Sequence, residues 1–490
     1  MVSVPRALGR IKDDLEPYLP ERSVEEACRE AGHRWRERKL GPAATLHLFV
    51  LQVLHFNTAI RHLRHLARGM AGGPVNAAAY CKARMRLPLA AVQVLLRSSS
   101  EAMRDAAGDA GGALWCGLRA YLVDGTGTIT PDTPALQKGF GQPKNQKPGC
   151  GFPVPKLLAL FDAFSGMVID VLASPLYTHD LRGAWQLHPL LSAGDLLVGD
   201  RGFCSYAHLA LLHLRGVLAC FRMHQRVIVD FRSRRRHGGK GEPKGKGEPK
   251  SRFVRRLGHW DQLVEWVRPD ARPKWMTREQ LGTLPRTLLV REVRYLLVEK
   301  GMRTRRVTVA TTLLDPGLYP KEKVAELYGM RWRVETHLAE LKTTLKMRKL
   351  KSKTPDGVRK ELAVYCLVYN LVRAVMTQAA KRQGTAPDRV SFLDALRWLL
   401  TAAPGEEPPD LVINPRRPGR HEPRVIKDLQ DTYRKMALPR AAMKKQLDRW
   451  RGRPKWMAFG TAPFCFGVRL RRAADADARR DRGSHDHGSG

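Results

Sequence analysis

Apolar and polar positions change their spacing several times along the first half of this 490-residue chain. Residues 1–112 carry amphipathic runs with apolar positions three and four residues apart, which predicts helices. From about residue 113, short apolar runs end in turn residues: Asp124 follows the run 121–123, and Gly199-Asp200 follows the run 196–198. Runs of this kind predict strands. The pattern therefore predicts a helical module followed by a mixed α/β region.

The second half of the chain alternates at first and then becomes helical. Residues 216–230, 288–298 and 306–314 alternate apolar and polar positions, so we expect a β-rich insertion over 204–317. Pro320 precedes an uninterrupted helical pattern from Lys321 to Arg348, and a largely apolar helix is predicted over 357–382.

The pattern therefore divides the α/β region into two parts, 113–203 and 318–402, on either side of the insertion. The remaining residues, 403–490, are rich in Pro, Arg and Gly, and we expect them to be basic and partly disordered.

The charge of the chain points to an anionic polymer as its partner. Lys and Arg number 86 against 47 acidic residues, a formal net charge of +39. A ribosomal or chromatin-like basic protein has a similar composition and is the alternative at this stage. The N-terminal residues include no apolar stretch suited to a signal peptide, and no window reaches the roughly 18 or more consecutive apolar residues of a membrane span. We expect a cytoplasmic protein with access to the chromosome and no membrane partner.

Two basic segments are candidates for nucleic-acid contact. A predicted helix over 59–68 carries Arg61 and Arg64 on its polar face. Residues 232–256 hold eleven Lys and Arg against two Glu, and predict a flexible basic loop that includes Arg234, Arg235 and Arg236. Either segment could instead be an ordinary solvated surface.

Three carboxylates are spaced so that they could hold divalent cations. A pair of such ions about 4 Å apart can activate one oxygen and stabilise another at a phosphodiester. Hard cations require oxygen ligands. Asp124 and Asp200 each follow a predicted strand, and Glu335 lies on the long helix after the insertion. Asp162 is an alternative to Asp124, and His179-Asp180 could form a separate hydrolase site.

The helix around Glu335 places several polar residues on one face. At about 100° per residue, Tyr328, Arg331, Glu335 and Lys342 fall within roughly 60° of one another. This stripe suits a metal ligand beside a DNA backbone. A surface helix stabilised by an Arg331–Glu335 pair would give the same spacing.

The same residues resemble a known family. Tyr328, Arg331, Glu335 and Lys342 match the YREK pattern of IS4-type insertion-sequence transposases. Leu122-Val-Asp-Gly-Thr126 and Val198-Gly-Asp-Arg-Gly-Phe203 resemble that family's two aspartate motifs. Lys82-Ala-Arg-Met-Arg-Leu-Pro88 and Phe140-Gly-Gln-Pro143 extend the resemblance over roughly residues 40–380.

The resemblance implies a fold and a site. The fold is α/β, with an RNase H-like catalytic core interrupted by a β-rich insertion and preceded by a helical DNA-binding module. Asp124, Asp200 and Glu335 would be catalytic and hold two Mg²⁺ or Mn²⁺ ions. The expected DNA contacts on these segments are Tyr328, Arg331, Trp332, Lys342, Lys346, Arg348 and Arg201. Trp332 could stack on an extruded base or be a core residue.

The resemblance also implies an activity. We expect a DDE transposase that cuts transposon ends and joins them to target DNA, with double-stranded DNA carrying terminal inverted repeats as its substrate. A homodimer would pair the two ends, and the protein would be associated with the bacterial nucleoid. Two alternatives are a domesticated transposase that only binds DNA and a nuclease that cuts without joining.

Overall fold

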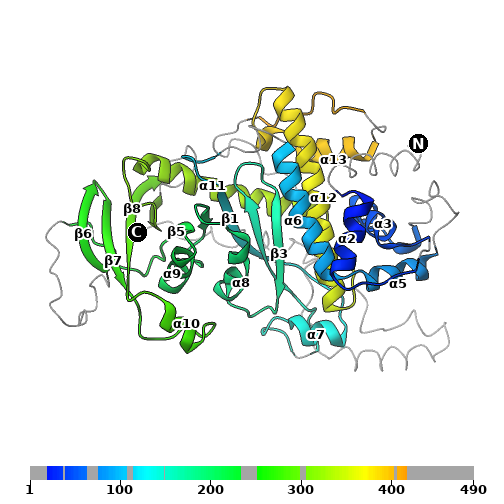
Figure 1. Ribbon diagram of the computed structural model, residues 1–490, viewed down its shortest axis with the longest axis horizontal. Helices are drawn as coiled ribbons and strands as arrows, with labels where there is room; N and C mark the ends of the chain where they lie inside the picture. The colour runs from blue at the N-terminus through cyan, green and yellow to red at the C-terminus, as the bar shows by residue number, and fades with distance from the viewer. Residues whose placement is uncertain are drawn as a thin grey trace, which may run out of the picture. The chain divides into compact units, whose positions relative to one another are not determined.

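The computed structural model describes residues 19–36, 39–62, 76–106, 114–147, 149–232, 251–297, 305–401 and 406–415. The described strands form one nine-stranded sheet in the order β3-β2-β1-β4-β5-β9-β8-β7-β6 (Figure 1). Their bounds are β1 Ala120–Gly127, β2 Lys156–Asp162, β3 Val168–Ser174, β4 Leu196–Gly199, β5 Leu218–Arg222, β6 Ser251–Gly258, β7 Asp261–Val267, β8 Thr287–Leu297 and β9 Arg305–Thr311. All these strands lie in one compact unit of the chain, and the mixed α/β class is confirmed.

The first five strands form the mixed part of the sheet. β1, β2 and β3 are antiparallel neighbours, whereas β4 and β5 run parallel to β1. Parallel neighbours need a crossover, because a tight hairpin would reverse the chain. Helix α9 (Tyr206–Leu214) supplies the crossover from β4 to β5, and helix α8 (Asp180–Leu187) lies between β3 and β4 in the chain.

The antiparallel part of the sheet begins at β9, which pairs with β5. The strands predicted over 288–298 and 306–314 are confirmed as β8 and β9, and β6 and β7 are additional. The strand predicted over 216–230 is confirmed only as the shorter β5, and residues 223–230 are not part of a strand. One prediction here is wrong: the last six residues of the expected basic loop, 251–256, belong to β6. They form a ladder with β7 across a hairpin at Trp260, which holds them in the sheet. Arg234, Arg235 and Arg236 lie outside the described residues.

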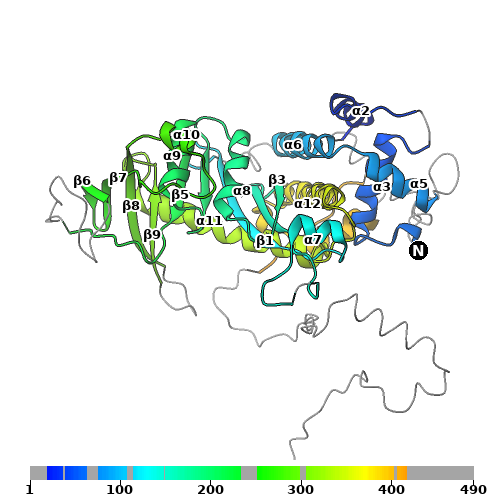
Figure 2. The same cartoon turned by 90° about the horizontal axis from the view of Figure 1, so that it is seen from below.

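Helices cover both faces of the mixed sheet (Figure 2). Leu122 of β1 packs in the apolar cluster of α11 (Lys321–Ala339) and α12 (Pro355–Arg382). Its neighbour Val123 packs in the cluster of α8 and α9 on the other face. Successive side chains of a strand point to opposite faces, so Asp124 shares the face of Leu122 and α11.

The N-terminal part is helical as predicted, with α2 (Glu21–Glu30), α3 (Pro42–Leu54), α5 (Ala77–Arg86) and α6 (Leu89–Ala106). In Figure 1, α6 lies beside α12, and both contact β3. The described part of the basic helix predicted over 59–68 is only the short 3₁₀ turn η1 (Ile60–His62), and Arg64 lies outside the described residues. The other helices are α7 (Pro134–Phe140), η3 (His188–Leu190), α10 (Arg278–Thr283), η5 (Pro387–Arg389) and α13 (Phe392–Thr401).

The helix predicted from Lys321 to Arg348 is shorter and less regular than expected. The α-helix α11 ends at Ala339 and continues as one π-helical turn, η4 (Glu340–Thr344). Lys346 then has a φ of +60°, which no α-helix accommodates, so the helix cannot continue to Arg348. π-turns of this kind are often found at functional sites.

Helix α12 lies in the interior of the fold. It is long and apolar enough to cross a membrane, but 94% of its most apolar window is buried inside the protein. Its packing against α6, α3 and β3 accounts for this apolar character. The helix predicted over 357–382 is confirmed, with two more residues at its start.

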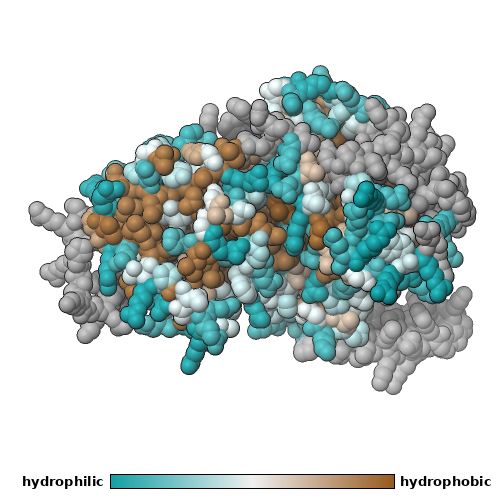
Figure 3. Space-filling view, viewed as in Figure 1, coloured by the Kyte–Doolittle hydropathy of each residue, from teal (hydrophilic) through white to brown (hydrophobic). Residues whose placement is uncertain are grey.

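Apolar side chains also reach the surface. Figure 3 shows them gathered over the end of the sheet that contains β7 and β8 and over α9. Val267, Leu289 and Leu214, one from each of these elements, are exposed. Exposed apolar groups that lie together are typical of interfaces.

A buried ion pair ties the antiparallel strands to the start of α11. Arg291 of β8 is fully buried, and its Nε donates to Asp261 Oδ1 at 2.8 Å. Its Nη1 also donates to the carbonyl oxygens of Leu313 and Tyr319, at 3.3 and 2.6 Å. Both carbonyls belong to the segment that leads into α11. The guanidinium of Arg291 therefore holds the segment that precedes α11 against β8.

Replacing Arg291 with Met is expected to destabilise β7 and β8 by about 3–5 kcal/mol, because the carboxylate of Asp261 is left buried without its cation. Native-state hydrogen exchange of the β8 amides measures this loss. The double variant Arg291→Met, Asp261→Leu should lose less than the single variant, since no charge remains unpaired. A single variant as protected as the wild type would contradict this assignment.

Candidate active site

The parallel register of β1 and β4 brings two aspartates together. Val123 lies opposite Gly199, so Asp124 and Asp200, one residue further along, lie beside each other where β4 ends. Asp124 is the fifth residue of β1 and does not follow the strand as expected, because the ladder with β2 extends to Gly127. Each carboxylate accepts a backbone N–H from the next residue: Gly125 N at 2.7 Å and Arg201 N at 2.5 Å.

Gly199 leaves room for two side chains beside the end of β4. A Cβ there would lie 3.0 Å from Val123 Cγ1 and 3.0 Å from the ring of Phe203. Any larger residue would therefore require one of these side chains to shift.

Helix α11 adds the third carboxylate and a cation. Arg331 Nη1 lies 3.4 Å from Asp124 Oδ2, and its Nη2 lies 3.1 Å from Glu335 Oε1, one helical turn further on. The Arg331 side chain is 6% exposed, against 53% for Glu335. Arg331 therefore contacts both Asp124 of the sheet and Glu335 at the surface. The alternative that Arg331 and Glu335 form only a surface pair is wrong, because the guanidinium is buried against Asp124.

The charges at this site act strongly on Asp124. Burial raises the pKa of Asp124, while the Gly125 N–H and the guanidinium of Arg331 lower it. The carboxylates of Asp200 and Glu335 raise the same pKa. Asp200 and Glu335 therefore each lie within electrostatic reach of Asp124, and Arg331 offsets part of the repulsion.

The donor set fits a hard divalent cation in its chemistry. Carboxylate oxygens are the ligands that Mg²⁺ and Mn²⁺ prefer. Among the residues that the structure describes, no three His, Cys, Asp or Glu side chains are close enough to form a complete metal-binding group. The guanidinium of Arg331 lies between Asp124 and Glu335 and supplies the positive charge there.

Tyr328 and Lys342, the other two residues of the predicted helical face, differ in their hydrogen bonds. Tyr328 is buried beneath Arg331, and its hydroxyl has no hydrogen-bond partner among the described residues. Burial raises its pKa, with Asp200 adding to the shift. Lys342 lies on the π-turn, and its Nζ donates to Thr126 Oγ1 at 2.8 Å. Burial lowers the pKa of Lys342, and the charge of Arg348 lowers it further.

The other expected DNA contacts lie around this centre. Trp332 is 40% exposed and stacks on Arg331, with 4.4 Å from the guanidinium carbon to the ring centroid, so the alternative that it is a core residue is wrong. Arg201 is exposed beside Asp200, and Lys346 is exposed beyond the π-turn. Arg61 is exposed on η1. This turn contacts α5.

Asp162 does not belong to this site. It lies opposite Tyr121, at the other end of β1 from the catalytic edge, because β2 runs antiparallel to β1. Its carboxylate accepts hydrogen bonds from the backbone and hydroxyl of Ser165. The alternative in which Asp162 replaces Asp124 is therefore wrong.

One residue of the site was not predicted: Thr126, which accepts the hydrogen bond of Lys342. Asp180 and Lys156 lie on the opposite face of the sheet from Asp124. Asp180 forms an ion pair of 2.6 Å with Lys156, and one of its oxygens lies 3.3 Å from where a Cβ on Gly125 would be. His179 caps α8 instead of joining a second metal site, since its Nδ1 accepts the N–H of Leu181. A lone His-Asp pair in the sequence does not distinguish a helix cap from a ligand.

Comparison with known proteins gives consistent matches. The family model described as "Transposase DDE domain" matches residues 115–371. The chain is 27% identical over 334 residues to the transposase InsG for insertion sequence element IS4 of Escherichia coli (strain K12), covering 64% of this chain and 69% of that protein. A solved piggyBac transposase synaptic complex with hairpin DNA aligns with a TM-score of 0.37 and 9% identity over 79% of both chains. At that TM-score the likeness carries no argument.

Replacing Arg331 with Met is expected to raise the pKa of Asp124 further, because a positive charge 3.4 Å from its Oδ2 is removed while Asp200 and Glu335 stay. A ¹³C NMR titration of the aspartate carboxyls in metal-free protein measures the change. Arg333→Met is the matched control, since Arg333 lies on the same helix but pairs with Asp388. An unchanged titration of Asp124 in the Arg331 variant would rule out the electrostatic role of Arg331.

Proposed function

This chain belongs to the transposase DDE-domain family, and we propose that Asp124, Asp200 and Glu335 are the residues with which it cuts and rejoins DNA. As a DNA transposase of that family, it is an enzyme of phosphodiester cleavage and strand transfer. The matched segment, 115–371, includes all three acids. The observations that support the assignment are the register that sets Asp124 beside Asp200 and the guanidinium of Arg331, which contacts both Asp124 and Glu335.

DDE transposases use divalent metal ions, and we assign two Mg²⁺ or Mn²⁺ ions to the three carboxylates. The chemistry that such ions supply is activation of the attacking oxygen and stabilisation of the leaving oxygen. The protein's own contribution is orientation. The N–H groups of Gly125 and Arg201 fix the two aspartates, and Arg331 holds Glu335 toward Asp124.

The basic and aromatic residues around the acids are assigned to the DNA. Lys342, oriented by Thr126, would bind a phosphate near the scissile bond. The buried hydroxyl of Tyr328 would donate to the same phosphate group, which would satisfy a polar atom that otherwise has no partner among the described residues. Trp332 is exposed enough to stack on an extruded base. Arg201, Lys346 and Arg348 would contact neighbouring phosphates.

The finer organisation of the chain is also part of this proposal. We assign an RNase H-like core to 113–203 and 318–402, a β-rich insertion to 204–317, and a DNA-binding module to 1–112. The strand order β3-β2-β1-β4 with its antiparallel and parallel pairs supports the first assignment, and β5 continues this sheet from within the bounds given to the insertion. Terminal inverted repeats and target DNA are the proposed substrates, in the bacterial cytoplasm at the nucleoid.

We further assign a homodimer to the complex that pairs two transposon ends. The exposed apolar residues of β7, β8 and α9 are the support for it. A binding-only protein or a non-joining nuclease is not favoured, because the matches are to transposases.

Asp124→Asn, Asp200→Asn and Glu335→Gln are each expected to abolish nicking and joining of labelled end DNA in Mg²⁺, because each removes a ligand charge. A loss of at least about 10²–10³-fold corresponds to about 2.7–4 kcal/mol of transition-state stabilisation. Denaturing gels that separate nicks, hairpins and joined products measure the change. A filter-binding assay measures end binding, which should persist.

Glu326→Gln is the matched control for these variants. Glu326 lies on α11 but pairs with Lys323 at the surface. It should cut like the wild type. Nicking that survives in any one of the three test variants would remove that residue from the site, and nicking without joined products in the wild type would favour the nuclease alternative.

A further inference from the structure

The turn after α3 holds two neighbouring residues in the left-handed region of the backbone. Phe56 has a φ of +55° and Asn57 a φ of +52°. A bulky side chain is strained there, because its Cβ crowds the backbone, and such outliers often mark functional sites. Phe56 is 38% exposed, whereas Asn57 is buried. The turn therefore presents an aromatic ring at the surface, and the surrounding structure has to hold it there.

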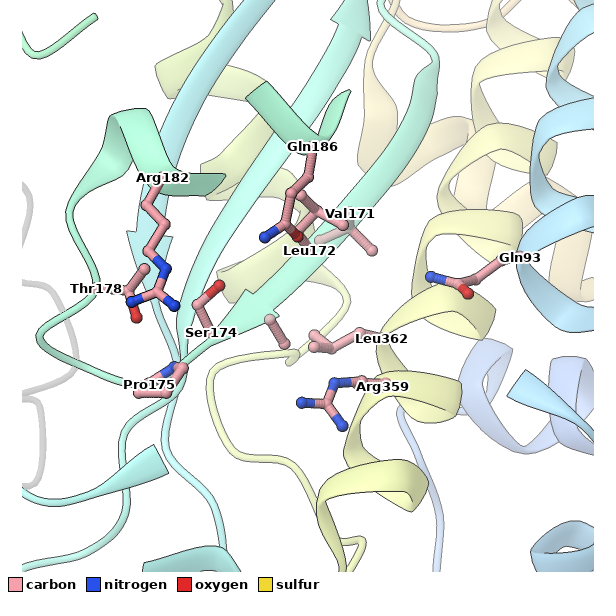
Figure 4. Close-up of a pocket in the computed structure, with 11 residues that line it drawn as sticks. Gln93, Val171, Leu172, Ser174, Pro175, Thr178, Arg182, Gln186, Arg359 and Leu362 are labelled. Atoms are coloured by element: carbon pink, nitrogen blue, oxygen red, sulfur yellow. The ribbon is translucent and has the colours of Figure 1, made fainter. Parts of the chain in front are cut away.

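The buried residue of this turn is anchored to α12. Asn57 Nδ2 donates to Glu361 Oε1 at 2.6 Å, and Glu361 is fully buried. In Figure 4, Arg359 and Leu362 of the same helix line a cavity of about 350 Å³ beside β3. Glu361 follows Arg359 by two residues, about 200° around the helix, so it faces away from that cavity. A carboxylate on the other side of α12 therefore fixes the strained turn.

The same carboxylate holds the segment that follows the catalytic helix. Glu361 Oε1 accepts the backbone N–H of Lys351 at 2.9 Å, and the Lys351 side chain donates to the carbonyl oxygen of Asn57. Earlier in this segment, Lys346 is exposed and has a φ of +60°. Its Nζ lies 5.1 Å from the centroid of the Phe56 ring. Two strained residues from distant parts of the chain therefore form one aromatic and cationic pair at the surface.

The pair lies near the catalytic edge of the sheet. The carbonyl oxygen of Met347, the residue after Lys346, accepts a hydrogen bond from Thr128 Oγ1 at 2.7 Å. Thr128 follows β1 and lies four residues after Asp124, so at most about 14 Å of chain separates these two residues. One turn of duplex is about 34 Å long, so DNA held at the carboxylates can also reach Phe56 and Lys346.

The chemistry of the pair suits a nucleotide. Aromatic rings stack on bases, and ammonium groups bind phosphates. Exposed cations also follow on both segments, Arg61 after Phe56 and Lys353 after Lys346. An aromatic ring flanked by cations is better suited to a nucleic acid than to an apolar protein surface.

We propose that Phe56 stacks on one base of the DNA end, within about one helical turn of the bond that is cut, while Lys346 binds a phosphate beside that base. The inference rests on the proposed function and adds to it a contact from the N-terminal helical part. Every base has an aromatic face, so the contact fixes the position of the DNA and not its sequence.

The first test compares binding of full-length variants to a labelled duplex from the end of the element, without divalent metal. Phe56→Ala should bind about 5–140-fold more weakly, the loss expected for stacking on one base. Phe56→Tyr keeps the ring and should bind like the wild type. Trp185→Ala is the matched control, since Trp185 is an exposed aromatic residue on α8, and it should also bind like the wild type. Wild-type affinity in Phe56→Ala, or equal losses in Phe56→Ala and Phe56→Tyr, would overturn the proposal.

Phe56→Gly separates the ring from the shape of the turn. Glycine adopts a φ of +55° without strain, so this variant should have a higher thermal unfolding temperature than Phe56→Ala. It should nevertheless bind DNA as weakly as Phe56→Ala, because both variants lack the ring. Wild-type binding by Phe56→Gly would overturn the proposal, because only the shape of the turn would then matter.

Salt dependence separates the ring from the lysine. Lys346→Gln should make the slope of log K against log salt shallower by about 0.9, the value for one phosphate. Phe56→Ala should leave this slope unchanged, since stacking displaces no counterion. A slope in Phe56→Ala equal to that of Lys346→Gln would overturn the proposal, because the ring would then act only by holding the lysine.

Duplexes with a single abasic position locate the base. One position within about one turn of the cut should weaken wild-type binding and have little further effect on Phe56→Ala. Abasic effects that persist at full size in Phe56→Ala at every position would overturn the proposal. Binding is measured without metal, so these outcomes are independent of cutting. Failure of the proposed function would appear instead as nicking that survives in the carboxylate variants.

Discussion

The structure of the site depends on the parallel register between β1 and β4. Because Val123 lies opposite Gly199, the backbone itself holds Asp124 and Asp200 side by side, and their carboxylates cannot move apart without breaking the ladder. Two neighbouring like charges that are only partly exposed to solvent are unfavourable unless a cation is present. Arg331 meets part of this requirement in the protein alone. The negative charge that Arg331 does not compensate makes this edge of the sheet suitable for divalent ions.

More than 120 residues separate Asp200 from α11 in the chain, yet the intervening strands do not disturb the site. They extend the same sheet outward from β5, so the chain leaves the core at one edge and returns beside it. Arg291 then fixes the segment before α11. The helix delivers Arg331 and Glu335 to the aspartates, and its π-turn turns Lys342 toward Thr126.

The sequence predicts those features that depend on local pattern. The apolar runs before Asp124 and Asp200 identify two strands, and the spacing from Tyr328 to Glu335 identifies one helical face. The end of that helix could not be predicted, because it depends on the positive φ of Lys346 and on packing by distant residues. Asp162 was an open alternative because sequence order does not give strand direction. The ion pair between Asp180 and Lys156 forms only when α8 packs against β2.

The central claim is that Asp124, Asp200 and Glu335 together hold divalent cations, and direct ion binding tests it without DNA or catalysis. Electron paramagnetic resonance of Mn²⁺ titrated into the wild type and into the three single carboxamide variants gives the bound fraction. The account predicts saturable binding by the wild type, weakened by each of the three substitutions and not by Glu326→Gln. Equal Mn²⁺ binding by the wild type and all three variants would contradict it.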